Sequence, residues 1–231
     1  MRGLLIFGIL LATLWGSAQA QDPPGLGTTV RGSLPLGRHV FPLLEGEWTV
    51  AAVEDRTSSS STPVGRVILA QLSNDKLSRW IYLSTNLAWN SSNSWKRNKE
   101  YCDRRSVHYG YSDDLNSTKE TECWILNHRG ETLGENASQI WIDFYRWSDA
   151  RGRPNTSLEL GYFLVKSGDF LSAQYHFNPV VAGFPDTPTA SWRGNPWHAD
   201  MASKDARRLE YLRGLKATGQ DLFEKLKAAI K

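Results

Sequence analysis

The sequence has few of the residues and motifs that mark familiar metal, phosphate or hydrolase sites. It contains two cysteines in 231 residues, too few for a disulfide-dense scaffold or a four-thiolate zinc site. It lacks a Gly-rich phosphate loop of standard spacing, a Gly-x-Ser-x-Gly elbow and a His-Glu-x-x-His motif. Its net charge of +3 is too small to indicate nucleic-acid binding. The sequence therefore assigns no catalytic residue, no metal ligand and no cofactor.

Long apolar runs are also scarce, and the longest lies at the start of the chain. Residues 1–20 combine Arg2, an apolar stretch from Leu4 to Leu14 and the small residues of Ala18-Gln19-Ala20. This order is typical of a signal peptide cleaved after Ala20. The apolar stretch is too short to anchor the chain in a membrane. We therefore expect an exported protein, periplasmic or secreted, with no transmembrane segment in the mature chain.

Export predicts the state of the two cysteines. In an oxidising compartment Cys102 and Cys123 are expected to form a disulfide, closing a polar loop of about 20 residues and contributing about 3 kcal/mol. With His108 and His128 the same cysteines could instead bind zinc or copper. Strand alternation places Cys123 and His128 on opposite faces, which favours the disulfide.

Alternating apolar residues and turn signals predict antiparallel β-structure over residues 46–198. Residues 21–45 are rich in proline and glycine and are interpreted as an irregular lead-in. Residues 86–119 are interpreted as a long loop and residues 178–198 as an irregular connection. The predicted strands are 48–53, 64–72, 77–85, 122–127, 139–147, 158–166 and 170–177, two pairs of which form hairpins around residues 73–76 and 167–168. The fold class is therefore mainly β, an antiparallel barrel or sandwich of about seven to eight strands.

The last segment, 199–231, has a different period. From about Ser203 its apolar residues follow spacings of three and four, which predicts an amphipathic helix packed on the β domain. Leu209, Leu212, Phe223 and Leu226 are expected to be buried against the sheet.

Ten tryptophans give the sequence an unusual aromatic content. As a strand, residues 139–147 would place Trp141, Asp143, Tyr145 and Trp147 on one face, opposite Ile140, Ile142 and Phe144. Aromatic planes beside a carboxylate suit recognition of a sugar, a cation or a flat polar molecule. We interpret these four residues as possible ligand-binding residues, and the alternative is that the aromatic residues belong to the core.

Two histidines, His128 and His176, are further possible ligand-binding residues. His176 shares a strand face with Ser172 and Gln174, and this face is expected to meet solvent or line a cavity. As a catalytic base His176 would need a nucleophile, and the sequence names none.

Two resemblances rest on short segments. Gly46-Glu47-Trp48 resembles the start of lipocalin-type barrels, which implies a carrier of a small apolar ligand. The same segment, together with residues 123–128 and 196–200, is similar to an uncharacterised group of exported proteobacterial proteins. That second resemblance implies an envelope location and carries no activity.

Three hypotheses of function follow. The first is an exported, non-catalytic binding or interaction module of the cell envelope, whose partner is an unknown small molecule or envelope protein. The second is a lipocalin-like carrier, which needs a large internal cavity. The third is a metal-independent hydrolase with residues such as His128 and Asp143. A cleft that holds a histidine, a carboxylate and a hydroxyl within hydrogen-bond reach would favour the enzyme.

Overall fold

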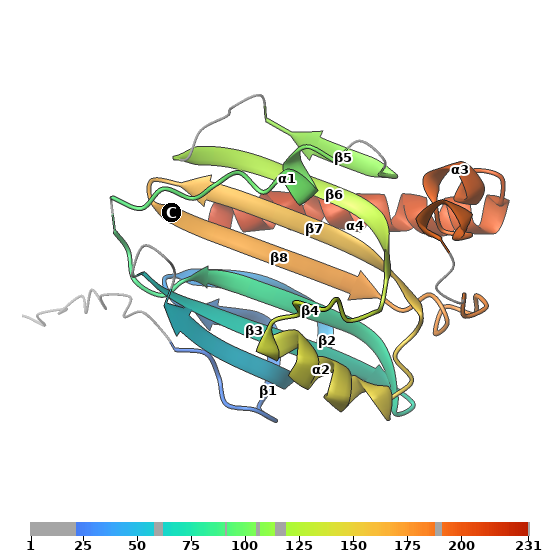
Figure 1. Ribbon diagram of the computed structural model, residues 1–231, viewed down its shortest axis with the longest axis horizontal. Helices are drawn as coiled ribbons and strands as arrows, with labels where there is room; N and C mark the ends of the chain where they lie inside the picture. Colours follow the sequence, from blue (N-terminus) through green and yellow to red (C-terminus); the bar gives the residue numbers. More distant parts are fainter. Residues whose placement is uncertain are drawn as a thin grey trace, which may run out of the picture.

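Eight strands form one antiparallel sheet in the order β1-β2-β3-β4-β8-β7-β6-β5 (Figure 1). This computed structural model describes residues 22–57, 62–90, 92–104, 107–113, 119–187 and 191–230, apart from the side chains of residues 56 and 57. The expected signal peptide and its cleavage point lie outside these residues. The strands are β1 (Thr29–Leu36), β2 (His39–Thr57), β3 (Pro63–Ser73), β4 (Lys76–Asn86), β5 (Tyr109–Ser112), β6 (Glu120–Gly130), β7 (Thr156–Lys166) and β8 (Asp169–Phe177). The strands at the two ends of this order, β1 and β5, do not pair with each other, so the sheet is open. The predicted fold class, mainly β with an antiparallel sheet, is confirmed.

Both predicted hairpins are present. The turn between β3 and β4 holds Asn74 at φ 49° and Asp75 at φ 60°, and the turn between β7 and β8 holds Ser167 at φ 51° and Gly168 at φ 90°. Two consecutive residues with positive φ form the two-residue turn whose twist matches that of the flanking strands. Asn, Asp and Gly tolerate this conformation, which explains why the sequence located both turns.

The prediction of an irregular lead-in was wrong. Residues 29–45 form β1 and the first part of β2. Gly32, at φ 70°, lies where the β1–β2 register shifts between Arg31 and Ser33, and Gly37, at φ 57°, forms the turn between the two strands. Pro35 lies on an edge strand, where a missing N–H costs no ladder bond. The glycines and proline therefore mark a bulge, a turn and an edge.

The prediction of a strand at 139–147 was also wrong, because these residues form helix α2 (Gln139–Asp149). Ile140, Phe144 and Ser148 follow one another at intervals of four and are all buried, as one stripe of a helix requires. The same segment alternates, so its pattern satisfied both periods. The predicted row of Trp141, Tyr145 and Trp147 therefore does not exist.

The long helix α4 (Ala206–Ala229) covers one face of the sheet and contacts β2, β6 and β7. Figure 1 shows α4 behind the sheet and the helices α1 (Lys99–Cys102) and α2 in front of it. Leu212, Phe223 and Leu226 are buried as predicted, whereas Leu209 is only half-buried. In the described chain no helix is long and apolar enough to span a membrane.

The predicted disulfide joins Cys102 of α1 to Cys123 of β6, with Cα atoms 5.1 Å apart. The segment 86–119, interpreted as a long loop, contains α1 and the short strand β5. On β6, Cys123 and Ile125 face the cluster under α1, while Trp124 and Leu126 face α4. After β8, the chain reaches α4 through a 3₁₀ turn (Trp192–Gly194) and the short helix α3 (Ala199–Ala202).

Candidate functional site

Helix α2 brings two of the predicted site residues, Trp141 and Tyr145, over a third, His176 of β8. The His176 ring stacks on Trp80 at 4.9 Å between ring centroids and meets the edge of Trp141 at 6.1 Å. The expectation that His176 meets solvent is wrong, because its side chain is fully buried. Its surroundings come from β4 and α2, which are distant in sequence.

A chain of hydrogen bonds joins His176 to a buried carboxylate. Glu131 accepts from the Tyr145 hydroxyl at 2.8 Å and from the Ser157 hydroxyl at 2.5 Å. The Ser157 oxygen lies 3.1 Å from Nδ1 of His176. Since the only Ser157 proton is donated to Glu131, His176 Nδ1–H must donate to Ser157, and Nε2 carries the lone pair. Burial and the nearby Arg129 lower the pKa of His176, which keeps the ring neutral.

This arrangement puts a histidine, a hydroxyl and a carboxylate within hydrogen-bond reach, but in the wrong order for nucleophilic catalysis. A catalytic histidine takes the proton of the hydroxyl. Here Ser157 donates to Glu131 instead, and all three residues are buried. The network ties α2 to β7 and β8, and its geometry is that of a structural support.

The cation of Arg129 lies at the edge of this network. Its guanidinium is 5.0 Å from the Trp141 ring centroid, donates to Gln174 at 3.3 Å and is 3.7 Å from a Glu159 oxygen. Burial raises the pKa of Glu159, and Arg129 opposes that rise. The buried acid therefore has its counterion within the protein.

The remaining predicted residues of α2 point elsewhere. Trp147 stacks on Phe144 and lies 4.1 Å under the Arg151 guanidinium. Asp143 accepts from Gln139 and Arg146 on the exposed side of the helix. Neither residue joins the network around Glu131. Their roles in ligand binding stay predictions.

His128 lies on the opposite face of the sheet from His176. Its ring stacks on Trp192 at 3.8 Å, and Nε2–H donates to the Trp192 carbonyl at 3.2 Å. His108 and His198 are close by, with ring centroids 6.4 Å and 5.7 Å from that of His128. Burial lowers the pKa of His128 to about 3. Despite the three histidines, no cluster in the described chain has the arrangement of a metal site.

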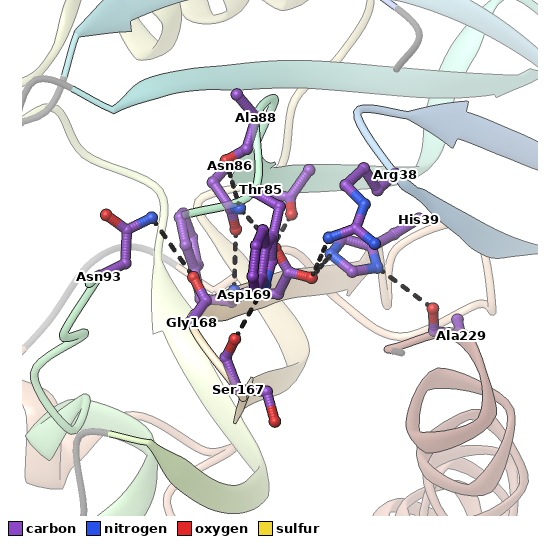
Figure 2. Close-up of polar contacts among 12 residues, drawn as sticks. Arg38, His39, Thr85, Asn86, Ala88, Asn93, Ser167, Gly168, Asp169 and Ala229 are labelled. Atoms are coloured by element: carbon purple, nitrogen blue, oxygen red, sulfur yellow. Dashed lines mark hydrogen bonds and ion pairs between the residues drawn. The ribbon is translucent and has the colours of Figure 1, made fainter. Parts of the chain in front are cut away.

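A second polar cluster lies at the end of the sheet where β7 turns into β8 (Figure 2). Asp169 is buried there and accepts from Asn86 at 2.6 Å and Arg38 at 3.3 Å, while His39 Nε2 lies 3.9 Å away. His39 Nδ1 is 3.2 Å from the Ala229 carbonyl in the last turn of α4. The hydrogen bonds and ion pairs of this cluster run between groups of the chain itself, so the cluster joins elements of the fold.

Three adjoining hollows lie at the other end of the sheet, around the segment 178–187 that follows β8. One, of about 430 Å³, includes Arg79 and is called the Arg79 hollow. A second, of about 480 Å³, lies along α4 beside Gly214 and is called the Gly214 hollow. Both are lined by Ala182 and Tyr211, so the two hollows meet there. A third, of about 490 Å³, shares Ser73, Asn178 and Val181 with the first.

Arg79 is a half-buried cation at this junction. It donates through Nε to Gln71 at 2.7 Å and through Nη2 to the Glu45 carbonyl at 3.0 Å, and it stacks over Trp48. Within the described chain it forms no salt bridge with a carboxylate, although Glu45 and Tyr211 act on it electrostatically. Burial lowers the pKa of Arg79. Three of its five N–H donors are left for another partner.

Sequence reasoning missed Arg79, and it missed Glu131, Ser157 and Arg129. A signal for Arg79 was present, because it has the same strand parity as Ile81 and Leu83, whose side chains face α4. An arginine at a core position of a strand is unusual enough to mark a candidate site. No comparable signal existed for Glu131, which lies outside every predicted strand.

Comparison with known proteins adds no name to this geometry. No family model, curated protein or solved structure matches the chain. The resemblances to lipocalin-type barrels and to exported proteobacterial proteins therefore stay predictions.

Proposed function

We propose that the protein is an exported, non-catalytic binding module of the cell envelope, and that a small molecule binds at the Arg79 hollow. The position of Arg79 carries this proposal. A half-buried cation is costly without a partner, and neither of its hydrogen-bond acceptors is an anion. The hollow is open at the point where that partner would enter. A ligand would complete the set of contacts around the guanidinium.

The hydrogen bond that the Ser157 hydroxyl donates supports binding over catalysis. The hydroxyl, histidine and carboxylate of Ser157, His176 and Glu131 are buried under α2, and the hydroxyl proton is donated to Glu131. None of these three residues lines the Arg79 or Gly214 hollow. A hydrolase that uses Ser157 is nevertheless the second candidate, because the three groups are within hydrogen-bond reach.

The position of α4 argues against a ligand inside the sheet, as a lipocalin-type carrier would hold it. The face that would line such a cavity is packed against Leu212, Leu222 and Leu226 of the helix. The hollows lie beside α4 at the end of the sheet. The disulfide between Cys102 and Cys123 supports export, because such bonds persist in oxidising compartments.

A ligand screen tests this function. Thermal unfolding is measured with a panel of small molecules that differ in charge and polarity, and at least one class is expected to raise the melting temperature in a saturable manner. Ala182→Trp fills the junction of the two hollows and should abolish the shift. The control, Leu133→Trp, alters an exposed residue that lines neither hollow and should leave the shift unchanged.

Two outcomes contradict the proposal. One is that no class of molecule stabilises the wild-type protein, or that stabilisation survives in Ala182→Trp. The other is labelling of Ser157 by a fluorophosphonate probe, with loss of labelling in Ser157→Ala, which would establish the hydrolase instead.

A further inference from the structure

The two hollows that meet at Tyr211 differ in chemistry. The Arg79 hollow presents a guanidinium, together with the apolar side chains of Leu72 and Val181 at its edge. Both apolar side chains are exposed, at 39% and 43%. The Gly214 hollow is predominantly apolar and is lined by Phe184, Leu215 and the ring of Tyr211. One cavity therefore offers charge, and its neighbour offers an apolar wall.

The contacts of Arg79 define what kind of group it can bind. Nε and one N–H of Nη2 are occupied, which leaves both N–H groups of Nη1 and one of Nη2. Adjacent N–H groups on the two terminal nitrogens match the two oxygens of a carboxylate. Tyr211 lines the same hollow as Arg79 and acts on it electrostatically, and its hydroxyl has no hydrogen-bond partner in the described chain, so it is a further donor in this hollow.

The charged side chains of the Gly214 hollow are already engaged. Arg207 donates to the carbonyls of Ala182 and Gly183 and lies over the Phe184 ring. Glu210 is 3.6 Å from Arg213. A Cβ atom built on Gly214 meets nothing within 4 Å, so the helix backbone itself forms an open wall there. This hollow is suited to an apolar chain.

We infer that the ligand is an amphipathic monocarboxylate, whose head group binds Arg79 and Tyr211 and whose apolar part lies in the Gly214 hollow along α4. This inference rests on the proposed function and names the class of its ligand. The combined hollows, about 430 Å³ and 480 Å³, fall within the range of small-molecule sites. The positive charge of Arg79 selects an anion. The apolar lining of the Gly214 hollow selects a ligand that also has an apolar part.

Calorimetric titration of the full mature protein with decanoate tests the inference. Decanoate is expected to bind with one site per chain. Acetate lacks the apolar tail, decanol lacks the charge and decyltrimethylammonium carries the opposite charge. Each of the three should bind at least about tenfold more weakly than decanoate. Arg79→Gln should weaken decanoate binding by about tenfold or more, because a charge-assisted pair is lost. The control Arg146→Gln, which changes an exposed arginine of α2 that lines neither hollow, should retain the wild-type affinity.

A second variant tests the tail independently of the head and keeps the test valid if Arg79→Gln fails to fold. Gly214→Leu places a side chain in the open Gly214 hollow and should reduce decanoate affinity by about tenfold while leaving the helix intact. Equal binding of decanol and decanoate, loss of binding in Arg146→Gln in place of Arg79→Gln, or an unchanged affinity in Gly214→Leu each overturns the inference. If another class of ligand binds and Ala182→Trp abolishes that binding, the inference fails while the proposed function stands.

Discussion

At the scale of single residues, burial fixes the charge state of several histidines. His108, His128 and His176 all have pKa values lowered mainly by burial. His176 keeps a lone pair on Nε2 without a partner, and His128 does so on Nδ1. Each ring is therefore held neutral, and taking up a proton would place a charge in a poorly solvated position.

This leads to a prediction about pH. The unfolded chain binds a proton to each histidine near its usual pKa of about 6.5, whereas folded His128 does so only near pH 3. The unfolded state thus binds more protons below about pH 6.5, and the free energy of unfolding falls as the pH is lowered. The expected slope is up to about 1.4 kcal/mol per pH unit for each such histidine.

Urea denaturation between about pH 7 and about pH 5 measures this slope. His128→Gln removes one titrating group, so its slope should be shallower than that of the wild type by the equivalent of about one proton. Comparing variant with wild type cancels the contribution of the carboxylates. Identical slopes in the two proteins would show that His128 does not couple folding to pH.

At the scale of elements, α4 and the sheet lie in close contact at Gly219. A Cβ atom at this position would lie 2.8 Å from the Trp124 ring and 2.9 Å from Leu160. The Tyr162 hydroxyl donates to the Gly219 carbonyl at 2.9 Å. Glycine inside a helix normally weakens it, so its presence here is explained by contact with the sheet.

We therefore expect opposite effects from two identical substitutions in α4. Gly219→Ala should lower the free energy of unfolding by about 1–3 kcal/mol, because the added methyl group overlaps Trp124 and Leu160. Gly214→Ala meets no atom within 4 Å and should raise it by up to about 1 kcal/mol through helix propensity. Denaturant titration of both variants measures the difference. A gain in stability for Gly219→Ala would show that α4 does not pack on the sheet as described.

At the scale of the whole molecule, the cluster around Asp169 joins parts of the chain that lie far apart in sequence. Asn86 ends β4, Arg38 lies in the turn before β2, and His39 begins β2 and contacts the Ala229 carbonyl at the end of α4 (Figure 2). These contacts hold the end of β4, the start of β2 and the end of α4 together. The Arg79 and Gly214 hollows lie at the other end of the sheet, so the proposed binding site is separate from this cluster.

Removal of the Asp169 carboxylate should lower the stability of the whole fold. Asp169→Ala leaves Asn86 and Arg38 without their acceptor and is expected to lower the free energy of unfolding by about 3 kcal/mol. Asp143→Asn, at an exposed ion pair with Arg146, serves as the control and should change it by less than about 1 kcal/mol. Equal effects of the two substitutions in a urea titration would contradict the assigned role of Asp169.

Much of the fold followed from local signals. The β3–β4 and β7–β8 hairpins were predicted because Asn74-Asp75 and Ser167-Gly168 tolerate positive φ between alternating strands. The disulfide followed from the presence of only two cysteines in a chain expected to be exported. The C-terminal helix followed from apolar spacings of three and four over 24 residues, a length at which one period excludes the other.

Tertiary structure decided what local pattern left open. Residues 139–147 satisfied both periods, and they became a helix because the outer face of β2 to β4 offers an apolar surface that Ile140 and Phe144 cover. The environment of His176 depended on Trp80 and α2, and the exposure of Arg79 depended on Tyr211 and residues 178–182. Sequence by itself determined the elements whose signals lie within a few residues of one another. Burial, pKa and the hollows depend on residues that lie far apart in sequence, such as Trp80 and His176, so only the packed structure determined them.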